Sequence, residues 1–364
     1  MKPVKVGIIG CGNISSIYLE NLTTCFDLVH VEALADLVPE RASEQAAKYG
    51  VKRVLTTEEL LADPTIELVV NLTIPASHAF ICSRALEAGK HVYVEKPLAV
   101  ELEDGIALHR LAAEKGLLLG GAPDTFLGSG IQTCLDLIHT GRIGRPVAAT
   151  AFMACHGHES WHPDPEFYYK VGGGPMFDMG PYYLTALFAL LGPARRLTGS
   201  TAITFQHRTI TSEKKNGQVI DVEIPTHIAG IMDMQNGSMA MIMTSFDVWS
   251  AKLPHIEIYG SEGTLSVPDP NTYGGPVRLR RWDDKEYEEI ILERPFAENS
   301  RGLGVADMAS AIRTGSMDPR AGSQMTLHVL EAMHGFHISS NKGYHYEMKT
   351  AFTAPPVLDP SFVR

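Results

Sequence analysis

The sequence lacks any long hydrophobic run, and no apolar stretch approaches the ~20 residues that a membrane-spanning helix needs. It also lacks an N-terminal charged region followed by an apolar cleavable segment, because Met1-Lys2-Pro3 leads directly into a strand-like run. We therefore expect neither membrane insertion nor secretion, and we predict a cytoplasmic protein.

Cysteine is scarce, and basic residues are outnumbered by acidic ones. The five cysteines form no CxxC pair and are odd in number, which fits reduced intracellular thiols better than a disulfide framework. There are 31 Lys and Arg residues against 42 Asp and Glu residues, so the formal net charge is −11. An acidic chain without a basic stripe is a poor candidate for binding nucleic acid or an anionic membrane, and neither partner is expected.

The length of the chain indicates two domains, because 364 residues exceed the usual size of one hydrophobic core. Over residues 1–123 apolar strands alternate with helices, which predicts an α/β domain with a doubly wound parallel sheet. Near Asp124 the pattern changes, and from Ala194 onward short strands punctuated by turn signals dominate, so 124–364 is predicted to hold an antiparallel or mixed sheet with a few helices.

The first strand-like run ends in a glycine turn, Gly10-Cys11-Gly12-Asn13-Ile14-Ser15. Gly10 permits a tight turn, and Gly12 lets backbone N–H groups approach a phosphate without an intervening Cβ. The helix expected over 14–22 points its positive N-terminal end at the same place. Ser15 stands where the usual fingerprint has Gly or Ala. The turn predicts a binding site for the pyrophosphate of a dinucleotide.

The second expected strand ends at Asp36, 24 residues after Gly12. A carboxylate at this position accepts both ribose hydroxyls of the adenosine half and repels a 2′-phosphate, so NAD is favoured over NADP. Alternatively, Asp36 begins a turn or caps the next helix, since Asp is a good N-cap residue. Arg41 is close enough to weaken the discrimination against NADP, so NADP is kept as the alternative cofactor.

Glu95-Lys96-Pro97 follows a further expected strand and puts an ammonium group at its carboxyl end. In a doubly wound sheet, ligands lie beyond the carboxyl ends of the strands, so Asp36, Thr73 and Lys96 can touch one bound molecule. Hydride transfer from a secondary alcohol requires removal of the hydroxyl proton, which a lysine can perform directly or through a neighbour. Lys96 is therefore a candidate catalytic residue, and the alternative is an ordinary surface lysine.

Three consecutive glycines at 172–174 precede Asp178 and Tyr182, which are four residues apart and would share one face of a helix. A carboxylate and a phenol that converge can bind a polyol hydroxyl and transfer its proton. Alternatively, Asp178 caps the helix and Tyr182 packs in the core. Tyrosine titrates near ~10, so Tyr182 would need help from Lys96 or from the positive ring of a cofactor to act as a base.

Histidines cluster in the segment Cys155-His156-Gly157-His158-Glu159-Ser160-Trp161-His162. On a strand His156 and His158 would face the same side, which makes a metal site one interpretation. We favour sugar binding, because the segment precedes the glycine cluster and because Trp161 suits the C–H face of a sugar ring. Loop packing is the third interpretation.

Together, these motifs resemble the glucose-fructose oxidoreductase and inositol dehydrogenase (Gfo/Idh/MocA) family over essentially the whole chain. The resemblance is carried by the glycine turn, the Asp36 strand end, Thr73-Ile74-Pro75 with His78, Glu95-Lys96-Pro97, and the cluster 172–182. It implies an N-terminal Rossmann domain (1–123) and a C-terminal α/β domain (124–364) with a large, mostly antiparallel open sheet. It also implies NAD(P) as cofactor, and sugars, cyclitols or their derivatives as substrates. Family members often associate through the open sheet, which implies a homo-dimer or homo-tetramer, and they mostly need no metal, so none is predicted.

The family's functional residues can be carried over by position. Lys96 matches the catalytic lysine and Asp178 the substrate-orienting aspartate. Tyr182 stands where many members have a histidine acid/base, and in this it is similar to glucose-fructose oxidoreductase and dihydrodiol dehydrogenase. Predicted cofactor contacts are Gly10, Gly12, Asn13, Ile14, Asp36, Arg41, Thr73, Pro75, His78, Glu95 and Lys96. Predicted substrate contacts are His156, His158, Trp161, His162 and Tyr183, whose phenol could reach the same space as that of Tyr182.

The leading functional hypothesis is an NAD(P)-dependent oxidoreductase that transfers hydride between a sugar or cyclitol secondary hydroxyl or carbonyl and nicotinamide. In a second hypothesis, tightly held NAD is reduced and reoxidised within one cycle, giving transfer between two sugars or elimination of a glycoside. A third is a non-catalytic NAD-responsive binding protein, which the presence of Lys96 and Asp178 argues against.

Overall fold

The computed structural model describes residues 1–359, and the chain packs as two compact units. The first unit holds 1–128, 298–330 and the described residues from Pro355, and the second holds 129–297 and 331–354. Helix α9 (Leu303–Thr314) belongs to the first unit because it packs against β1, β2, β4 and β5. The first unit thus takes 124–128, 298–330 and the described residues from Pro355 out of the stretch 124–364, whereas the domain boundary after residue 123 stays a prediction.

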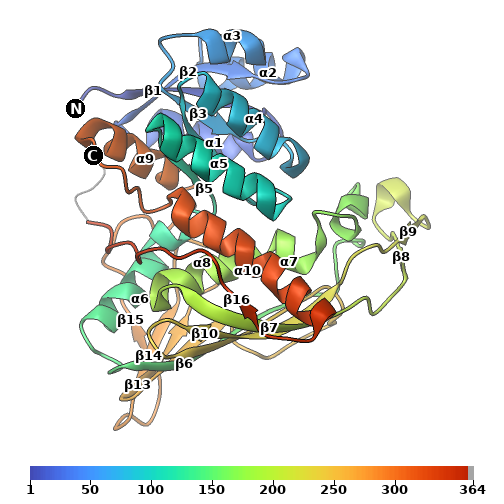
Figure 1. The fold of residues 1–364 in the computed structure, drawn as a ribbon, viewed down its shortest axis with the longest axis vertical. Helices are drawn as coiled ribbons and strands as arrows, with labels where there is room; N and C mark the ends of the chain where they lie inside the picture. The colour runs from blue at the N-terminus through green and yellow to red at the C-terminus, as the bar shows by residue number, and fades with distance from the viewer. Residues whose placement is uncertain (360–364) are drawn as a thin grey trace. The chain divides into compact units, whose positions relative to one another are not determined.

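The first unit is built on a five-stranded parallel sheet in the order β2-β1-β3-β4-β5 (Figure 1). All residues of β3 and β5 are buried, because helices cover both faces of the sheet. The strands are β1 (Val4–Ile9), β2 (Val29–Ala35), β3 (Leu68–Asn71), β4 (His91–Val94) and β5 (Leu119–Gly121). The helices before α9 are α1 (Ser15–Thr24), α2 (Pro39–Tyr49), α3 (Thr57–Ala62), α4 (Pro75–Glu87) and α5 (Leu102–Lys115).

Helix boundaries in this unit follow from local chemistry. The Thr56 side chain accepts a hydrogen bond from the Glu59 N–H, and the Glu59 side chain accepts one from the Thr56 N–H. This capping box starts α3. Helices α2 and α5 end at Gly50 and Gly116, which adopt left-handed backbone angles.

The second unit is built on a nine-stranded sheet in the order β15-β14-β13-β12-β6-β11-β10-β7-β16. Its strands pair antiparallel except for β6 with β11, so the predicted large, mostly antiparallel sheet is confirmed. The strands are β6 (Pro146–Ala154), β7 (Ala194–Ala202), β10 (His227–Met234), β11 (Met239–Ser245), β12 (Ile256–Gly260), β13 (Gly263–Val267), β14 (Val277–Arg281), β15 (Glu288–Ile290) and β16 (Tyr346–Glu347). A separate two-stranded sheet pairs β8 (His207–Thr209) with β9 (Val219–Asp221).

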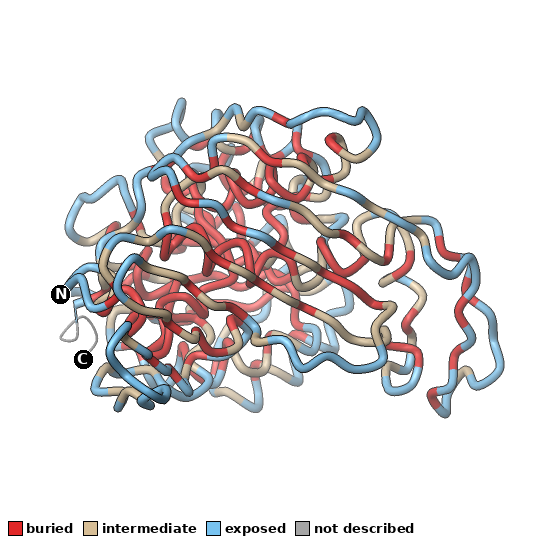
Figure 2. The backbone as a smooth tube through the Cα atoms, turned by 90° about the horizontal axis from the view of Figure 1, so that it is seen from below, coloured by how far each residue is buried: buried red, intermediate tan, exposed pale blue. Residues whose placement is uncertain are grey.

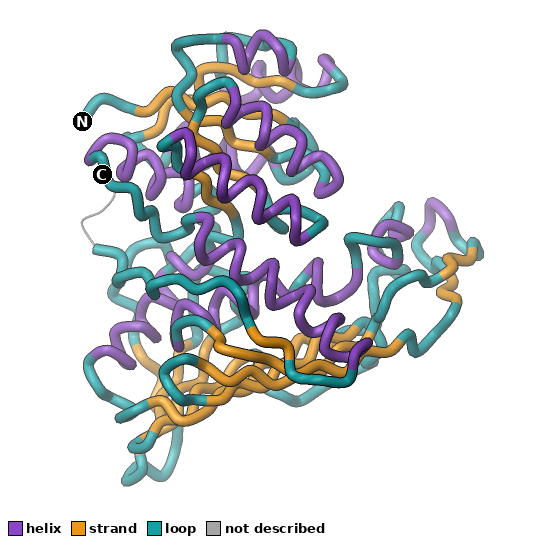
Figure 3. The backbone as a smooth tube through the Cα atoms, viewed as in Figure 1, coloured by secondary structure: helices purple, strands orange, loops and turns teal. Residues whose placement is uncertain are grey.

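Helices of the second unit lie on one side of the large sheet (Figures 1 and 3). Helices α6 (Ser129–His139), α7 (Gly174–Asp178) and α8 (Gly180–Leu191) contact its strands, and α10 (Ser323–Lys342) has residues in both units. Because helices cover only one face of this sheet, exposed and buried residues tend to alternate along its strands, as they do in β11 (Met239–Ser245). In Figure 2 most of the buried stretches lie inside, and the exposed ones mainly follow the loops. Among residues 1–359, no helix is long and apolar enough to span a membrane.

Candidate active site

The glycine turn after β1 has one closed side and one open side. Gly10 has a φ of +101°, and a Cβ there would lie 2.6 Å from the backbone of Leu72, so only glycine fits. A Cβ at Gly12 would meet no atom within 4 Å. The open side at Gly12 therefore fits the close approach of a phosphate to the backbone, beside the start of α1.

Asp36 is bound to the glycine turn. Its carboxylate accepts the Cys11 N–H at 2.6 Å and the Val38 N–H at 2.8 Å. Burial, with a contribution from Asp36, raises the pKa of the Cys11 thiol to about 12, so this cysteine stays protonated and packs rather than acts as a nucleophile. The end of β2 and the end of β1 are thus held together by hydrogen bonds.

Four of the predicted cofactor positions follow consecutive strands of the sheet. Asp36 follows β2, the glycine turn follows β1, Thr73 follows β3, and Lys96 follows β4. Strand order reverses at β1 and β3, which is the switch point where open α/β sheets bind ligands. Three strand spacings of about 4.8 Å separate the Asp36 strand from the Lys96 strand, so a ligand that contacts both ends must be extended, as a dinucleotide is.

Lys96 is positioned by the buried carboxylate of Glu95. Glu95 accepts the Lys96 N–H at 2.8 Å and the Tyr18 hydroxyl at 2.9 Å, and Tyr18 is fully buried in α1. Burial and then the Glu95 charge raise the pKa of Tyr18 well above its ordinary value, so its hydroxyl stays a donor. Sequence reasoning missed Tyr18, because it lies 77 positions from Glu95 and no local pattern marks it.

His78 joins two loops at the same sheet edge. Its Nδ1 lies 2.7 Å from the Pro97 carbonyl oxygen and its Nε2 lies 3.0 Å from that of Thr73, and the ring is fully buried. Burial lowers the pKa of His78, and the neutral ring has one N–H, so it donates to one of the two carbonyls at a time. This arrangement favours a positioning role for His78 over direct contact with a cofactor.

The remaining predicted cofactor residues lie at helix starts or on the surface. Asn13 and Arg41 are exposed, Ile14 is the N-cap residue of α1, and Pro75 opens α4. The sequence analysis did not single out two exposed apolar residues at the same sheet edge: Leu37, 97% exposed, lies two residues after β2, and Ile74, 69% exposed, lies three residues after β3. Exposed apolar side chains beside a predicted ligand site are candidates for contact with the ligand, and an apolar residue shortly after a strand end is the sequence signal for them.

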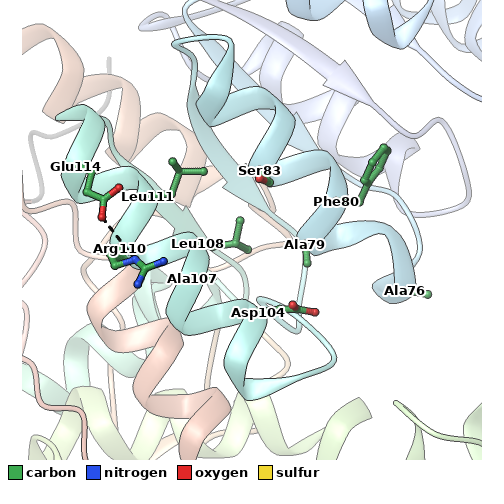
Figure 4. A pocket seen from close by; sticks show the side chains of 10 residues that line it. All are labelled: Ala76, Ala79, Phe80, Ser83, Asp104, Ala107, Leu108, Arg110, Leu111 and Glu114. Carbon is green, nitrogen blue, oxygen red and sulfur yellow. Dashed lines mark ion pairs between the residues drawn. The ribbon is translucent and has the colours of Figure 1, made fainter.

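A cavity of about 510 Å³ in the first unit lies between α4 and α5 (Figure 4). Phe80, Leu108 and Leu111 line it, and Arg110 pairs with Glu114 at 3.5 Å on its wall. It contains none of the predicted cofactor residues, because it opens between helix faces rather than at the strand ends.

In the second unit, the structure brings together two residues that the sequence analysis singled out separately. His158 Nε2 lies 3.2 Å from Asp178 Oδ2, and the two side chains are 11% and 18% exposed. The His158 ring also lies 4.0 Å from the Tyr168 ring and 4.7 Å from the Phe246 ring, measured between centroids. A carboxylate and an imidazole in an aromatic setting form a group that can bind and orient a hydroxyl.

The segment with His156 and His158 is not a strand, so the strand geometry on which the metal-site interpretation depended is absent. Strand β6 ends at Ala154, and Gly157 has a φ of +81° with Glu159 and Tyr169 side-chain oxygens 2.2 Å from where a Cβ would stand. His156 instead stacks on Trp249 with centroids 3.4 Å apart. Across residues 1–359, no group of three or more His, Cys, Asp or Glu side chains is arranged to hold a metal ion.

Asp178 and Tyr182 lie on two short helices and not on one, because the helical run is interrupted at Met179 between α7 and α8. Tyr182 is 7% exposed. The Tyr183 hydroxyl bonds to His255 Nδ1 at 2.9 Å, and burial raises the pKa of this phenol, which favours a packing role for Tyr183.

The two remaining predicted substrate residues lie beside His158. Trp161 is 61% exposed, and its ring stands edge-on to His158 at 5.2 Å and to His162 at 5.4 Å. His162 Nδ1 also accepts the Asp164 N–H at 3.1 Å. The segment therefore gathers aromatic rings around the Asp178–His158 pair.

A glycine turn, an acidic strand end and a lysine at one edge of a doubly wound parallel sheet define a dinucleotide-binding protein. Comparison with known families agrees. The family model "Oxidoreductase family, NAD-binding Rossmann fold" matches residues 4–121, and "GFO/IDH/MocA C-terminal domain" matches residues 131–266. The chain therefore belongs to the Gfo/Idh/MocA family of oxidoreductases, which confirms the resemblance, the fold class and the NAD-binding domain.

Similar proteins act on sugars and inositols according to their names. A dTDP-3,4-didehydro-2,6-dideoxy-alpha-D-glucose 3-reductase from Saccharopolyspora spinosa is 34% identical, over 55% of this chain and 60% of its own length. A scyllo-inositol 2-dehydrogenase (NADP(+)) from Bacillus subtilis is 23% identical over 87% of this chain and 88% of its own. The apo form of levoglucosan dehydrogenase superposes with a TM-score of 0.81 at 19% identity, covering 97% of this chain and all of that one (100%).

Proposed function

We propose that this protein is an NAD(H)-dependent dehydrogenase or reductase that acts on a secondary hydroxyl or carbonyl of a sugar, a cyclitol or a derivative. The observation that carries the proposal is the place of Lys96. It stands at the carboxyl end of β4, on the same sheet edge as the glycine turn and Asp36, with its backbone fixed by Glu95. The names of the similar proteins support the substrate class.

The proposed roles follow from the chemistry of each side chain. NAD, when bound, supplies the hydride acceptor at nicotinamide C4. Asp178, oriented by His158, accepts a hydrogen bond from the substrate and fixes its position. Tyr182 would take the proton from the substrate hydroxyl oxygen with help from the Lys96 ammonium, and the carbon that bears this hydroxyl would give up hydride and become a carbonyl. Reduction runs through the same steps in reverse.

The preference for NAD over NADP rests on Asp36. Two backbone N–H groups hold its carboxylate at the end of β2, where it would accept the ribose hydroxyls and repel a 2′-phosphate. Arg41 is exposed one turn into α2, so it is the residue through which NADP would be tolerated. We propose NAD as the preferred cofactor on this balance.

Replacement of Lys96 by Met tests the function. Incubation of the wild-type protein with NAD and a panel of sugars and inositols, followed at 340 nm, should give NADH with one substrate class. Lys96→Met should lower kcat by about 10²–10⁴-fold, because it keeps the length of the side chain and removes the ammonium. NAD binding, measured by thermal shift, should stay unchanged.

Lys115→Met is the matched control, because Lys115 is exposed on α5 and should leave turnover at the wild-type rate. Unchanged turnover in Lys96→Met would overturn the catalytic assignment. If sugars bind but no NADH accumulates, while a second sugar is reduced, the cofactor is recycled within one catalytic cycle. If no sugar in the panel causes any redox change, a binding role for the protein would be favoured.

We propose a second copy of this chain as the partner of the open sheet, giving a homo-dimer or homo-tetramer. On its outer face, Ile231 and Met241 pair across β10 and β11 and are 51% and 39% exposed, with Met239 beside them at 56%. Adjacent exposed apolar side chains on a regular sheet favour contact with another protein surface.

A cytoplasmic location is part of the same proposal. None of the five cysteines is in a disulfide. Burial raises the pKa of Cys82 to about 12 and raises that of Cys134 further, so both thiols are chemically inert. Such thiols are typical of a reducing compartment.

A further inference from the structure

A cavity of about 540 Å³ lies wholly within the second unit, and we call it the Trp249 cavity. Its walls come from the loop after β6, from β8 and from the loop after β11, and neither Asp178 nor Tyr182 lines it. Its volume is within the range of small-molecule sites, about 300–1,000 Å³. The residues that matter here are His156, Glu159, Phe205, Arg208 and Trp249.

One wall of the Trp249 cavity is an aromatic platform. Trp249 is 82% exposed, and the His156 ring stacks on it at 3.4 Å with an angle of 13° between the planes. Phe205 is 42% exposed and stands edge-on to His156 at 6.2 Å. Because the stacking holds the indole in a fixed orientation, it offers a flat apolar surface to a ligand. Such a surface suits the C–H face of a sugar ring.

The base of the Trp249 cavity is charged, but it does not favour anions. The Arg208 side chain is 4% exposed, donates to Glu159 at 3.0 Å and to the Phe246 carbonyl at 2.8 Å, and pairs with Asp247. One guanidinium thus faces two carboxylates, so the positive charge is more than balanced. A phosphate or carboxylate ligand would meet net repulsion, whereas a neutral polyol would not.

Two buried polar atoms of this cavity's walls have no hydrogen-bond partner among the described residues. They are Nδ1 of His156 and Nε of Arg208. Buried polar atoms are nearly always paired, so these two are exceptions in the lining of one cavity. Because neighbouring protein atoms cover both of them, a ligand would reach them only after a small side-chain movement. A hydroxyl group both donates and accepts, and therefore suits an imidazole nitrogen and a guanidinium N–H alike.

The Trp249 cavity and the Asp178–His158 pair share one short segment of chain. Gly157, with its φ of +81°, lets His156 stack on Trp249 while His158 bonds to Asp178. The Cα atoms of His156 and His158 are at most about 7 Å apart, so the backbone that carries the two sites is one continuous loop.

We propose that the Trp249 cavity is an accessory subsite for a neutral sugar unit, so that the substrate is a disaccharide or glycoside. One unit would lie at Asp178–His158 and the next on Trp249. The inference rests on the proposed function for the identity of the reacting unit, while the subsite itself rests on the cavity.

The test compares two exposed tryptophans. Calorimetric titration without NAD would use methyl β-glucoside, cellobiose and maltose on the wild type, Trp249→Ala and Trp282→Ala. Trp282 is 75% exposed at the end of β14 and is the matched control. We expect a disaccharide to bind at least 10-fold more tightly than the methyl glycoside. Trp249→Ala should remove that advantage, and Trp282→Ala should keep it.

Equal affinities for the methyl glycoside and the disaccharides would overturn the subsite proposal. Equal disaccharide affinities of Trp249→Ala and Trp282→Ala would overturn it too. Thermal melting of both variants checks that they fold. Turnover at 340 nm separates the two proposals. NADH formation from monosaccharides with no effect of Trp249→Ala leaves the proposed function and removes the subsite. Disaccharide binding that depends on Trp249, without any redox change, leaves the subsite and removes the proposed function.

Discussion

The two sheets of this protein use the same backbone geometry in opposite ways. Strand β3 of the parallel sheet is buried along its whole length, whereas β11 of the large sheet alternates between exposed and buried residues. A sheet covered on both faces presents only its strand ends to a ligand, so its chemistry gathers at Asp36, Thr73 and Lys96. A sheet covered on one face leaves its second face free to contact another surface. The helices that cover a sheet therefore decide where its functional surface can be.

The largest expected effect concerns the doubly covered sheet. Leu68 in β3 is fully buried, so Leu68→Ala should lower the free energy of unfolding by about 2–5 kcal/mol through lost transfer energy and the cavity left behind. Urea denaturation followed by circular dichroism measures it. A loss below about 1 kcal/mol would show that the helices on the two faces fill the cavity left by the truncated side chain. It would contradict the view that this sheet is rigidly covered on both faces.

The next effect separates stability from binding within the glycine turn. Gly10→Ala should destabilise the protein by about 1–3 kcal/mol, because both its φ and the Leu72 backbone exclude a Cβ. Gly12→Ala should leave the melting temperature unchanged, because no atom lies within 4 Å. Its affinity for NAD should fall by at least about 10-fold, since the methyl group occupies the approach of the phosphates. Unchanged affinity in Gly12→Ala would place the dinucleotide elsewhere.

A smaller effect is expected from pH in the second unit. Burial, helped by His334, lowers the pKa of His337 to about 4. The unfolded chain binds this proton near pH 6.5 and the folded chain near pH 4, so stability is full above pH 6.5 and falls as pH drops toward 4. Because His337 is partly exposed, we expect a loss of order 1–2 kcal/mol. His337→Gln should flatten the unfolding free energy over this window, and a wild-type slope in the variant would refute the assignment.

The smallest effect on stability is expected on the outer face of the large sheet. Met241→Lys should change the unfolding free energy of the protomer by no more than about 0.5 kcal/mol, because the side chain is 39% exposed. It should nevertheless reduce the molar mass measured by light scattering, because the lysine charge would be buried between copies. Ala113→Lys on the exposed side of α5, in the other unit, is the control. An unchanged molar mass for Met241→Lys would indicate that the copies do not associate through this face.

Sequence reasoning reached the parts of the site that depend on neighbours along the chain. The glycine turn, the Asp36 strand end and Lys96 are each defined by a few consecutive residues, and the parallel order of strands then brings them to one edge. The family resemblance extended this to Asp178, but the stacking of His156 on Trp249 gave no sequence signal.

The parts that could not be predicted are contacts between distant segments. Glu159 and Arg208 are 49 positions apart, and both are common residue types that no pattern distinguishes. The different partners of His156 and His158, Trp249 and Asp178, depend on the left-handed backbone of Gly157, whose φ is not encoded by composition. Such features emerge only when the tertiary structure fixes the backbone.

The hydrogen-bonded side chains at the edge of the parallel sheet have a mechanical consequence. Asp36 ties the end of β2 to the turn at Cys11, Glu95 joins α1 to the backbone of Lys96 through Tyr18, and His78 connects the loops after β3 and β4. The loops that would surround a dinucleotide are therefore cross-linked into one rim instead of moving as separate flaps. A rim ordered in advance loses little conformational entropy when a ligand arrives, so more of the contact energy appears as affinity.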